Sequence, residues 1–183
     1  MAKTTTKVLL TSEEFVKSQT NISDNVSGKY ILTAIREAQD IALQRTIGGP
    51  LFRKLKQLVE NDAVDAEENE AYADLLTLCQ YFLAYQAVAE VLPKLSYKIT
   101  NAGVVKTGDE QIQNVTLEEL STQQATYRTK AAHYQRDIQR FCLNNRAALP
   151  ELNECQCRDI RAHLETQYTG GLYLGGARGK ILP

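Results

Sequence analysis

The sequence contains no tryptophan, one methionine, two histidines and four prolines among its 183 residues. Two histidines leave few candidates for acid–base catalysis or for a histidine-rich metal site. Neither charge predominates, because 21 basic residues stand against 22 acidic ones and the formal net charge is -1. A chain without a cationic excess lacks a global means of binding a polyanion by counterion release, which argues against duplex DNA or RNA as its ligand.

An early apolar run is also missing. The first ten residues lack the stretch of roughly 7–15 apolar residues that a secretory signal requires, so we expect the protein to stay in the cytoplasm where it is made. In that compartment thiols remain reduced. We therefore expect no disulfide among the four cysteines, which are Cys79, Cys142, Cys155 and Cys157.

No long stretch is apolar without interruption. The most apolar segment, residues 75–92, contains Thr77, Gln80, Gln86 and Glu90. Four polar side chains within a span of that length favour the buried central helix of a bundle over a membrane-spanning helix.

The first half of the chain carries helical patterns. Thr11 and Glu14 have the spacing of a capping box and predict a helix over about 12–19. Apolar residues at helical spacing then predict a second helix, which ends near Thr46 before a glycine pair. Pro50 suits the first position of a third helix.

The second half predicts two longer helices separated by a hairpin. One helix is expected over about 67–92, with Pro93 ending it. Residues 97–107 are rich in β-branched side chains around a glycine and predict a short hairpin. Thr116 and Glu119 form a second capping-box pattern, which begins the other helix.

This last helix carries a long apolar seam, in which residues recur alternately three and four positions apart. Such a seam packs lengthwise on another helix. Its members are Leu117, Leu120, Gln124, Tyr127, Ala131, Tyr134, Ile138, Phe141 and Asn145. The sequence therefore predicts an all-α helical bundle over residues 1–166, with the two longest helices antiparallel, and an extended glycine-rich C-terminal arm over residues 167–183.

The glycine-rich tail raises the question of a phosphate-binding loop. The pattern G-x-x-x-x-G-K-[ST] supplies backbone amides for a phosphate and a hydroxyl for magnesium. Here Leu174 occupies the first glycine position and Ile181 the hydroxyl position, and G-x-G-x-x-G fails at Leu174 as well. We predict neither a nucleotide site nor any other cofactor or reaction, because no other catalytic constellation is present.

One possible metal site remains open as an alternative. This site would consist of Cys155, Cys157 and His163, because thiolates and imidazoles bind zinc. Their spacing departs from the two-to-four-residue separation usual in structural zinc sites, so free thiols near a helix end are the simpler interpretation.

Tyrosine is the more informative residue type, since nine tyrosines accompany only four phenylalanines. Tyrosine is common in protein contact surfaces, because its ring packs in the apolar centre while its hydroxyl forms hydrogen bonds at the hydrated rim. We predict partner-binding residues in the hairpin and the arm: Tyr97, Ile99, Val104, Tyr168, Leu172, Tyr173, Leu174 and Arg178. Basic residues of the last long helix, among them Arg128 and Arg146, most simply solubilise that helix, and a contact with an acidic partner surface is the alternative.

Several segments resemble a known family. They are ILTAIREAQDIALQRTIGGPLFRKL (residues 31–55), YRTKAAHYQRDIQRFCLNN (127–145), LPEL (149–152) and the later GGLYLGG. Together they look like the head–tail connector, or neck adaptor, proteins of tailed bacteriophages, including the crAss-like group.

The resemblance implies a structural virion protein rather than an enzyme. It implies a homo-oligomeric ring, often of twelve copies, docked under the portal protein at the head–tail neck. Such a ring extends the DNA channel without reading sequence, offers a surface to tail or further neck proteins, and involves no membrane. The acidic run of residues 60–70 would then face the lumen. The alternative, from a different class, is a small helical binding module with the Cys/His metal site.

Overall fold

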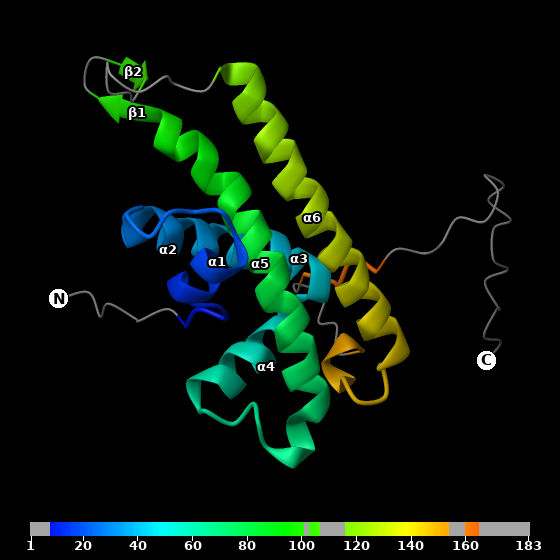
Figure 1. Cartoon of the computed structure of the whole chain (residues 1–183). Coiled ribbons are helices and arrows are strands. Elements are labelled where there is room, and N and C mark those ends of the chain that lie inside the picture. The colour runs from blue at the N-terminus through cyan, green and yellow to red at the C-terminus, as the bar shows by residue number, and fades with distance from the viewer. Residues whose placement is uncertain (1–7, 101–102, 107–115, 154–159, 165–183) are drawn as a thin grey trace, which may run out of the picture.

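The computed structural model describes residues 8–100, 103–106, 116–153 and 160–164. Within these residues the fold is all-α, as predicted (Figure 1). Six α-helices are interrupted or joined by short π and 3-10 segments, and one two-stranded ribbon follows the fifth helix.

Two long helices form the axis of the molecule. These are α5 (Glu70–Ser96) and α6 (Leu117–Asn144), and they run side by side in opposite directions (Figure 1). The antiparallel order is visible in their contacts, because Gln124 of α6 meets Ala89 of α5 whereas Tyr134 meets Tyr81. The predicted antiparallel pair is therefore present.

The remaining helices pack against this pair. They are α1 (Glu13–Gln19), α2 (Gly28–Glu37), α3 (Gln44–Ile47) and α4 (Gly49–Glu60). Two 3-10 turns, η2 (Glu67–Asn69) and η3 (Pro150–Leu152), lie before α5 and after α6. Pro50 occupies the first turn of α4, where its missing amide hydrogen is not needed, as predicted.

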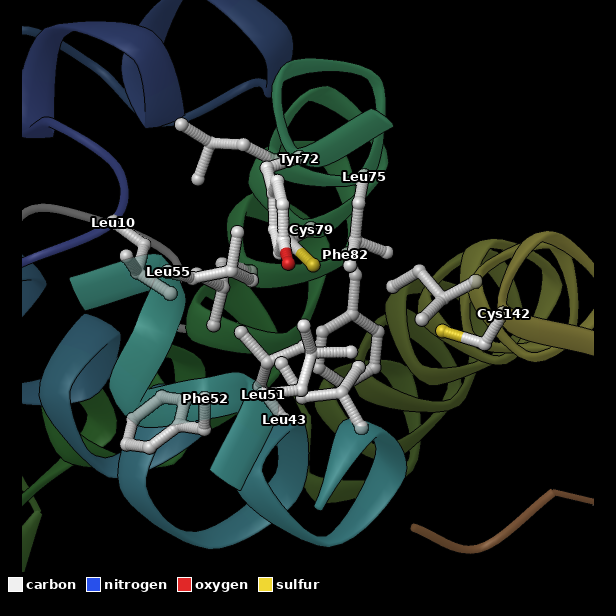
Figure 2. Packing of buried hydrophobic residues seen from close by; sticks show 14 of the residues in the cluster. Leu10, Leu43, Leu51, Phe52, Leu55, Tyr72, Leu75, Cys79, Phe82 and Cys142 are labelled. Atoms are coloured by element: carbon white, nitrogen blue, oxygen red, sulfur yellow. The ribbon is translucent and has the colours of Figure 1, made fainter. Parts of the chain in front are cut away.

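Two apolar clusters form the core. The larger one joins α4, α5 and α6 around Leu51, Leu55 and Phe82 (Figure 2), and the smaller one joins α1 and α2 to the second half of α5. Helix α5 is long and apolar enough to cross a membrane by length and composition, but half of its most apolar window is buried inside the protein. Its apolar character therefore fits a core helix.

Pro93 does not end the helix, which corrects the prediction. Helix α5 continues through Pro93 to Ser96. A proline leaves the carbonyl four residues earlier without its helical donor, here that of the fully buried Ala89. Gln124 of α6 donates its Nε2–H to that carbonyl at 2.9 Å. The helix tolerates proline because a side chain of the neighbouring helix replaces the lost donor.

The helix caps were predicted with one error. Ser12, rather than Thr11, caps α1, since its hydroxyl accepts the amide N–H of Phe15. Thr11 is buried, and its hydroxyl has no hydrogen-bond partner among the described residues. At α6 the predicted capping box is present, with reciprocal hydrogen bonds between Thr116 and Glu119.

The predicted apolar seam of α6 is confirmed except at its first position. Tyr127, Ala131 and Ile138 are buried against the rest of the bundle, but Leu117 is 67% exposed. Leu117 is the first residue of the helix, ahead of the part that packs on α5.

A π-helical segment, η1 (Ala38–Leu43), joins α2 to α3 within the second predicted helix. Its Gln39 is fully buried and holds the N-terminal segment: Gln39 Oε1 accepts the amide N–H of Leu10 at 2.8 Å, and Nε2 donates to the carbonyl of Val8 at 3.0 Å. Gln80 of α5 donates to the carbonyl of Leu10. Such π-helical turns occur often at functional sites.

The ribbon consists of β1 (Tyr97–Thr100) and β2 (Gly103–Lys106), paired antiparallel. The register places Ile99 opposite Val104 and Tyr97 opposite Lys106. The ribbon continues directly from α5 and lies at the end of the α5–α6 pair (Figure 1).

Candidate interaction surface

An extended segment at residues 160–164, which we call the strap, lies against the junction of α3 and α4. Helix α3 ends at Ile47, so the carbonyl of Arg45 lacks a helical donor, and the amide of Gly49 at the start of α4 lacks a helical acceptor. The strap supplies both partners. The amide of His163 donates to the Arg45 carbonyl at 3.0 Å, and the amide of Gly49 donates to the Ile160 carbonyl at 2.8 Å.

Two further contacts hold the strap. Gln139 of α6 donates its Nε2–H to the carbonyl of His163 at 2.6 Å, and Leu164 packs against the larger core cluster. The strap is thus tied to three helices that precede it in the sequence.

Gly48 is the residue that permits this close approach. Its φ of 85° and ψ of 158° lie in a region that only glycine adopts readily. A Cβ at this position would also lie 2.9 Å from the amide nitrogen of Ala162. Any side chain at position 48 would therefore both strain the backbone and push the strap away.

A groove of about 570 Å³ runs between the strap, α6 and the η1–α3 turn. Its lining residues are Ile41, Ala42, Arg45, Gln135, Ile160, Arg161 and His163. Ile41 and Ile160 are 63% and 43% exposed, and both arginines are exposed. The groove therefore combines apolar side chains with positive charge.

An acidic loop lies elsewhere on the molecule. Between α4 and α5, the six acidic residues of positions 60–70 are all exposed; they are Glu60, Asp62, Asp65, Glu67, Glu68 and Glu70. No basic residue interrupts them. The loop is held in one shape: Asp62 takes a left-handed conformation with φ of 52°, and the amide of Ala63 donates to the carbonyl of Leu58 at the end of α4.

Asn69 completes this restraint. Its Nδ2 donates to the carbonyl of Ala63 at 2.8 Å, and Ala63 and Val64 pack against the larger core cluster. The carboxylates are therefore displayed on a preformed scaffold.

The predicted partner-binding residues separate into two groups. Tyr97, Ile99 and Val104 belong to the ribbon, whose register brings their backbones together. Tyr168, Leu172, Tyr173, Leu174 and Arg178, with the rest of the arm, lie outside the described residues. Sequence reasoning missed the strap groove, for which Gly48 was the visible signal.

The proposed metal ligands are only partly described. Cys155 and Cys157 lie outside the described residues, whereas His163 is exposed at the groove. In the part of the chain that the structure describes, no three histidine, cysteine or acidic side chains gather as a metal site would require.

Cys79 and Cys142 are buried in the core. Burial raises the pKa of Cys79 well above its usual range, with a smaller contribution from Cys142. Burial also raises the pKa of Cys142 to about 12. Both groups are therefore neutral thiols that pack as small hydrophobic side chains.

Four tyrosines line the contact between α5 and α6. Tyr81 and Tyr85 of α5 stack against Tyr134 at 5.2 and 5.6 Å between ring centroids, and Tyr85 also stacks on Tyr127. Lys130 places its ammonium within 5.5 Å of two of these rings. This group of tyrosines thus joins the two long helices, and two of its members, Tyr127 and Tyr134, belong to the predicted seam.

Comparison with known protein families gives a match over most of the described bundle. The model of the family of unknown function DUF6712 matches residues 43–162, which span α3, α4, α5, the ribbon, α6 and most of the strap. Neither the curated proteins nor the solved structures contain a match to this chain.

Proposed function

We propose a structural role for this chain, which belongs to the DUF6712 family: it is a head–tail connector of a tailed phage, forming a ring beneath the portal protein. The function of this family is unknown, so the match by itself assigns no role. The proposal rests on the resemblance of its sequence segments to neck adaptors and on the distribution of contact features over the bundle.

The observation that carries the proposal is the separation of these features. The ribbon lies at one end of the α5–α6 pair, and the acidic loop lies at the end where α5 begins (Figure 1). The strap groove lies between them against α3 and α6. A subunit of a closed ring needs two different complementary patches for its neighbours and further surfaces for the proteins above and below.

In this role the ribbon and the arm are the contacts to portal, tail or neighbouring subunits. β1 and β2 pair only with each other among the described residues, so each strand has an outer edge available for another chain. Tyr97, Ile99 and Val104 would contribute from the ribbon, and residues 167–183 would reach across as an arm that orders on binding. The ring lumen would pass DNA without sequence-specific contacts.

Native mass spectrometry over a concentration series tests the proposal, with electron microscopy of the largest species and with the portal protein of the same phage as template. The expected result is a closed ring with a central channel, formed alone or on the portal, which fails to form after deletion of residues 170–183. A chain that remains monomeric and does not bind the portal would contradict it. A mass excess of one zinc per chain, lost in Cys155→Ser, would favour the metal-binding module instead.

A further inference from the structure

We infer that the strap groove binds the acidic loop of a second copy of this chain, so that these two surfaces form the contact between neighbouring subunits. The inference rests on the proposed ring and specifies its subunit interface. It assigns the acidic run to a protein contact rather than to the lumen.

The groove has the chemistry to bind a carboxylate-bearing segment. Arg45 is exposed, and its guanidinium has no ion-pair or hydrogen-bond partner in the described ranges. Arg161 lines the same groove, and none of the described lining residues is acidic. An arginine offers several donors in a planar arrangement that matches a carboxylate.

Apolar surface adds a second component. Ile41 is 63% exposed, although it lies within the helical segment η1, and Ile160, which lines the same groove, is 43% exposed. Interface centres combine such apolar contacts with arginine, which is enriched there relative to the rest of the surface. Covering both isoleucines gives the contact a driving force that salt does not screen.

The acidic loop is the complementary surface on the same molecule. Its six exposed carboxylates have no cationic partner among the residues that the structure describes. Because Asn69 and the Asp62 turn hold the loop in one shape, little ordering entropy is lost when it binds. Opposite charge on two preformed surfaces steers association and selects the partner.

The positions of the two surfaces require two molecules. Figure 1 shows the loop at the end of the bundle where α5 begins, while the strap lies along α3 and α6. A contact between different patches on identical chains is head-to-tail, and it closes into a ring when the rotation per subunit permits. The loop of one copy in the groove of the next is a head-to-tail contact of this kind.

The test is sedimentation velocity at low ionic strength with charge-reversed full-length chains. Arg45→Glu reverses the groove, and the double substitution Glu67→Lys/Glu68→Lys reverses the loop. Each is expected to weaken association at least about tenfold, and a chain carrying both sets is expected to recover most of the loss, because the charges are again opposite. All these side chains are exposed, so folding should be retained.

Matched controls carry the same charge changes at exposed positions away from both surfaces. Lys29→Glu controls the groove variant, and Glu14→Lys/Asp24→Lys controls the loop variant. Both are expected to associate like the natural chain.

A direct contact measurement supplements the association data. Arg45→Lys keeps the charge and places an amine in the groove, so a carbodiimide can join position 45 to a carboxylate in direct contact. An intermolecular link to residues 60–70, found by mass spectrometry, is the expected product.

The results that would contradict this subunit contact differ from those that would contradict the connector role. If the natural chain forms rings that neither reversal weakens, the interface lies elsewhere and the connector role stands. If the chain does not self-associate at low salt and position 45 links to no second copy, the inference is wrong, while binding to the portal still decides the connector role. If position 45 links only to an added acidic partner protein, the groove serves that partner instead.

Discussion

At the scale of single residues, three glutamine side chains complete the hydrogen bonding of the backbone where the secondary structure is interrupted. Gln39, Gln124 and Gln139 each reach a backbone group that lies outside their own helix. Each satisfies a carbonyl or amide that secondary structure leaves unpaired. A buried backbone group without a partner costs about as much as a lost hydrogen bond, so these glutamines stabilise local irregularities that the sequence pattern alone would disfavour.

The Gln124–Pro93 pair gives the sharpest test of this view. Gln124→Ala should lower the free energy of unfolding by about 1–3 kcal/mol, because the Ala89 carbonyl loses its donor inside the protein. In a Pro93→Ala background the residue at position 93 supplies its own amide hydrogen, so the same substitution should cost less than half as much. Urea unfolding of the four chains measures this difference, and equal costs in the two backgrounds would contradict the explanation.

The buried thiols give a second test at this scale. With the pKa of Cys142 at about 12 and that of Cys79 raised by burial, little thiolate forms near neutral pH. In a Cys155→Ser/Cys157→Ser background, alkylation by iodoacetamide at about pH 8 should be roughly a thousandfold slower than in the urea-unfolded chain. Mass spectrometry follows the rate. A difference smaller than about tenfold would show that the thiols are accessible.

At the scale of elements, much of the architecture is predictable and the junctions are not. Hydrophobic periodicity and capping signals are local, so they predicted the helical class, the start of α4 at its proline and the capping box of α6. The continuation of α5 through Pro93 depends on the side chain of Gln124, which is 35 residues from the Ala89 carbonyl that it binds. The π-helical turn and the strap likewise depend on distant partners, which local patterns do not contain.

The candidate site also has a part that local sequence patterns predict and a part that depends on distant residues. The two halves of the ribbon are neighbours in sequence, so Tyr97, Ile99 and Val104 could be grouped before the structure was known. The groove joins residue 45 to residue 163, and no periodicity relates such positions. Only Gly48, with its required conformation, marked the place where the strap approaches.

The helix junction at Gly48 supplies the first test at this scale. Gly48→Ala should destabilise the fold by roughly 1–3 kcal/mol, because the backbone there adopts a conformation reserved for glycine and the new Cβ meets Ala162. Gly48→Asn should cost a similar amount, since asparagine tolerates the left-handed helical region but not this one. Thermal and urea unfolding measure both. A loss below about 0.5 kcal/mol for either would mean that the strap is not held as described.

The start of α6 supplies a test by pH. Hydrogen bonds from the backbone and hydroxyl of Thr116 lower the pKa of Glu119. A carboxyl with a lowered folded-state pKa stabilises the fold above its unfolded value, and the contribution disappears as pH falls through the folded value. Glu119→Gln removes the charge, so its effect on unfolding should be present near neutral pH and shrink below about pH 4. An effect independent of pH would contradict a role for the charge.

At the scale of the whole molecule, folding and assembly should be separable. Among the described residues, both apolar clusters lie between Leu9 and Leu164. Deletion of residues 170–183 should therefore leave the unfolding midpoint of the dilute chain within about 2 °C of the natural value, while it abolishes ring formation. Calorimetry at low concentration measures the first effect. A large loss of stability would assign the tail to the fold rather than to a neighbour.

The position of the strap in the sequence also determines when the groove is completed during translation. The strap comes late in the chain, yet it forms one wall of the groove and pairs with Arg45 and Gly49, more than a hundred residues earlier. A nascent chain still emerging from the ribosome can form α1 through α5, but it lacks this wall until translation passes residue 164. Chains cut short before that point have no complete groove, so under the proposed head-to-tail contact they would lack the surface that binds a neighbouring copy.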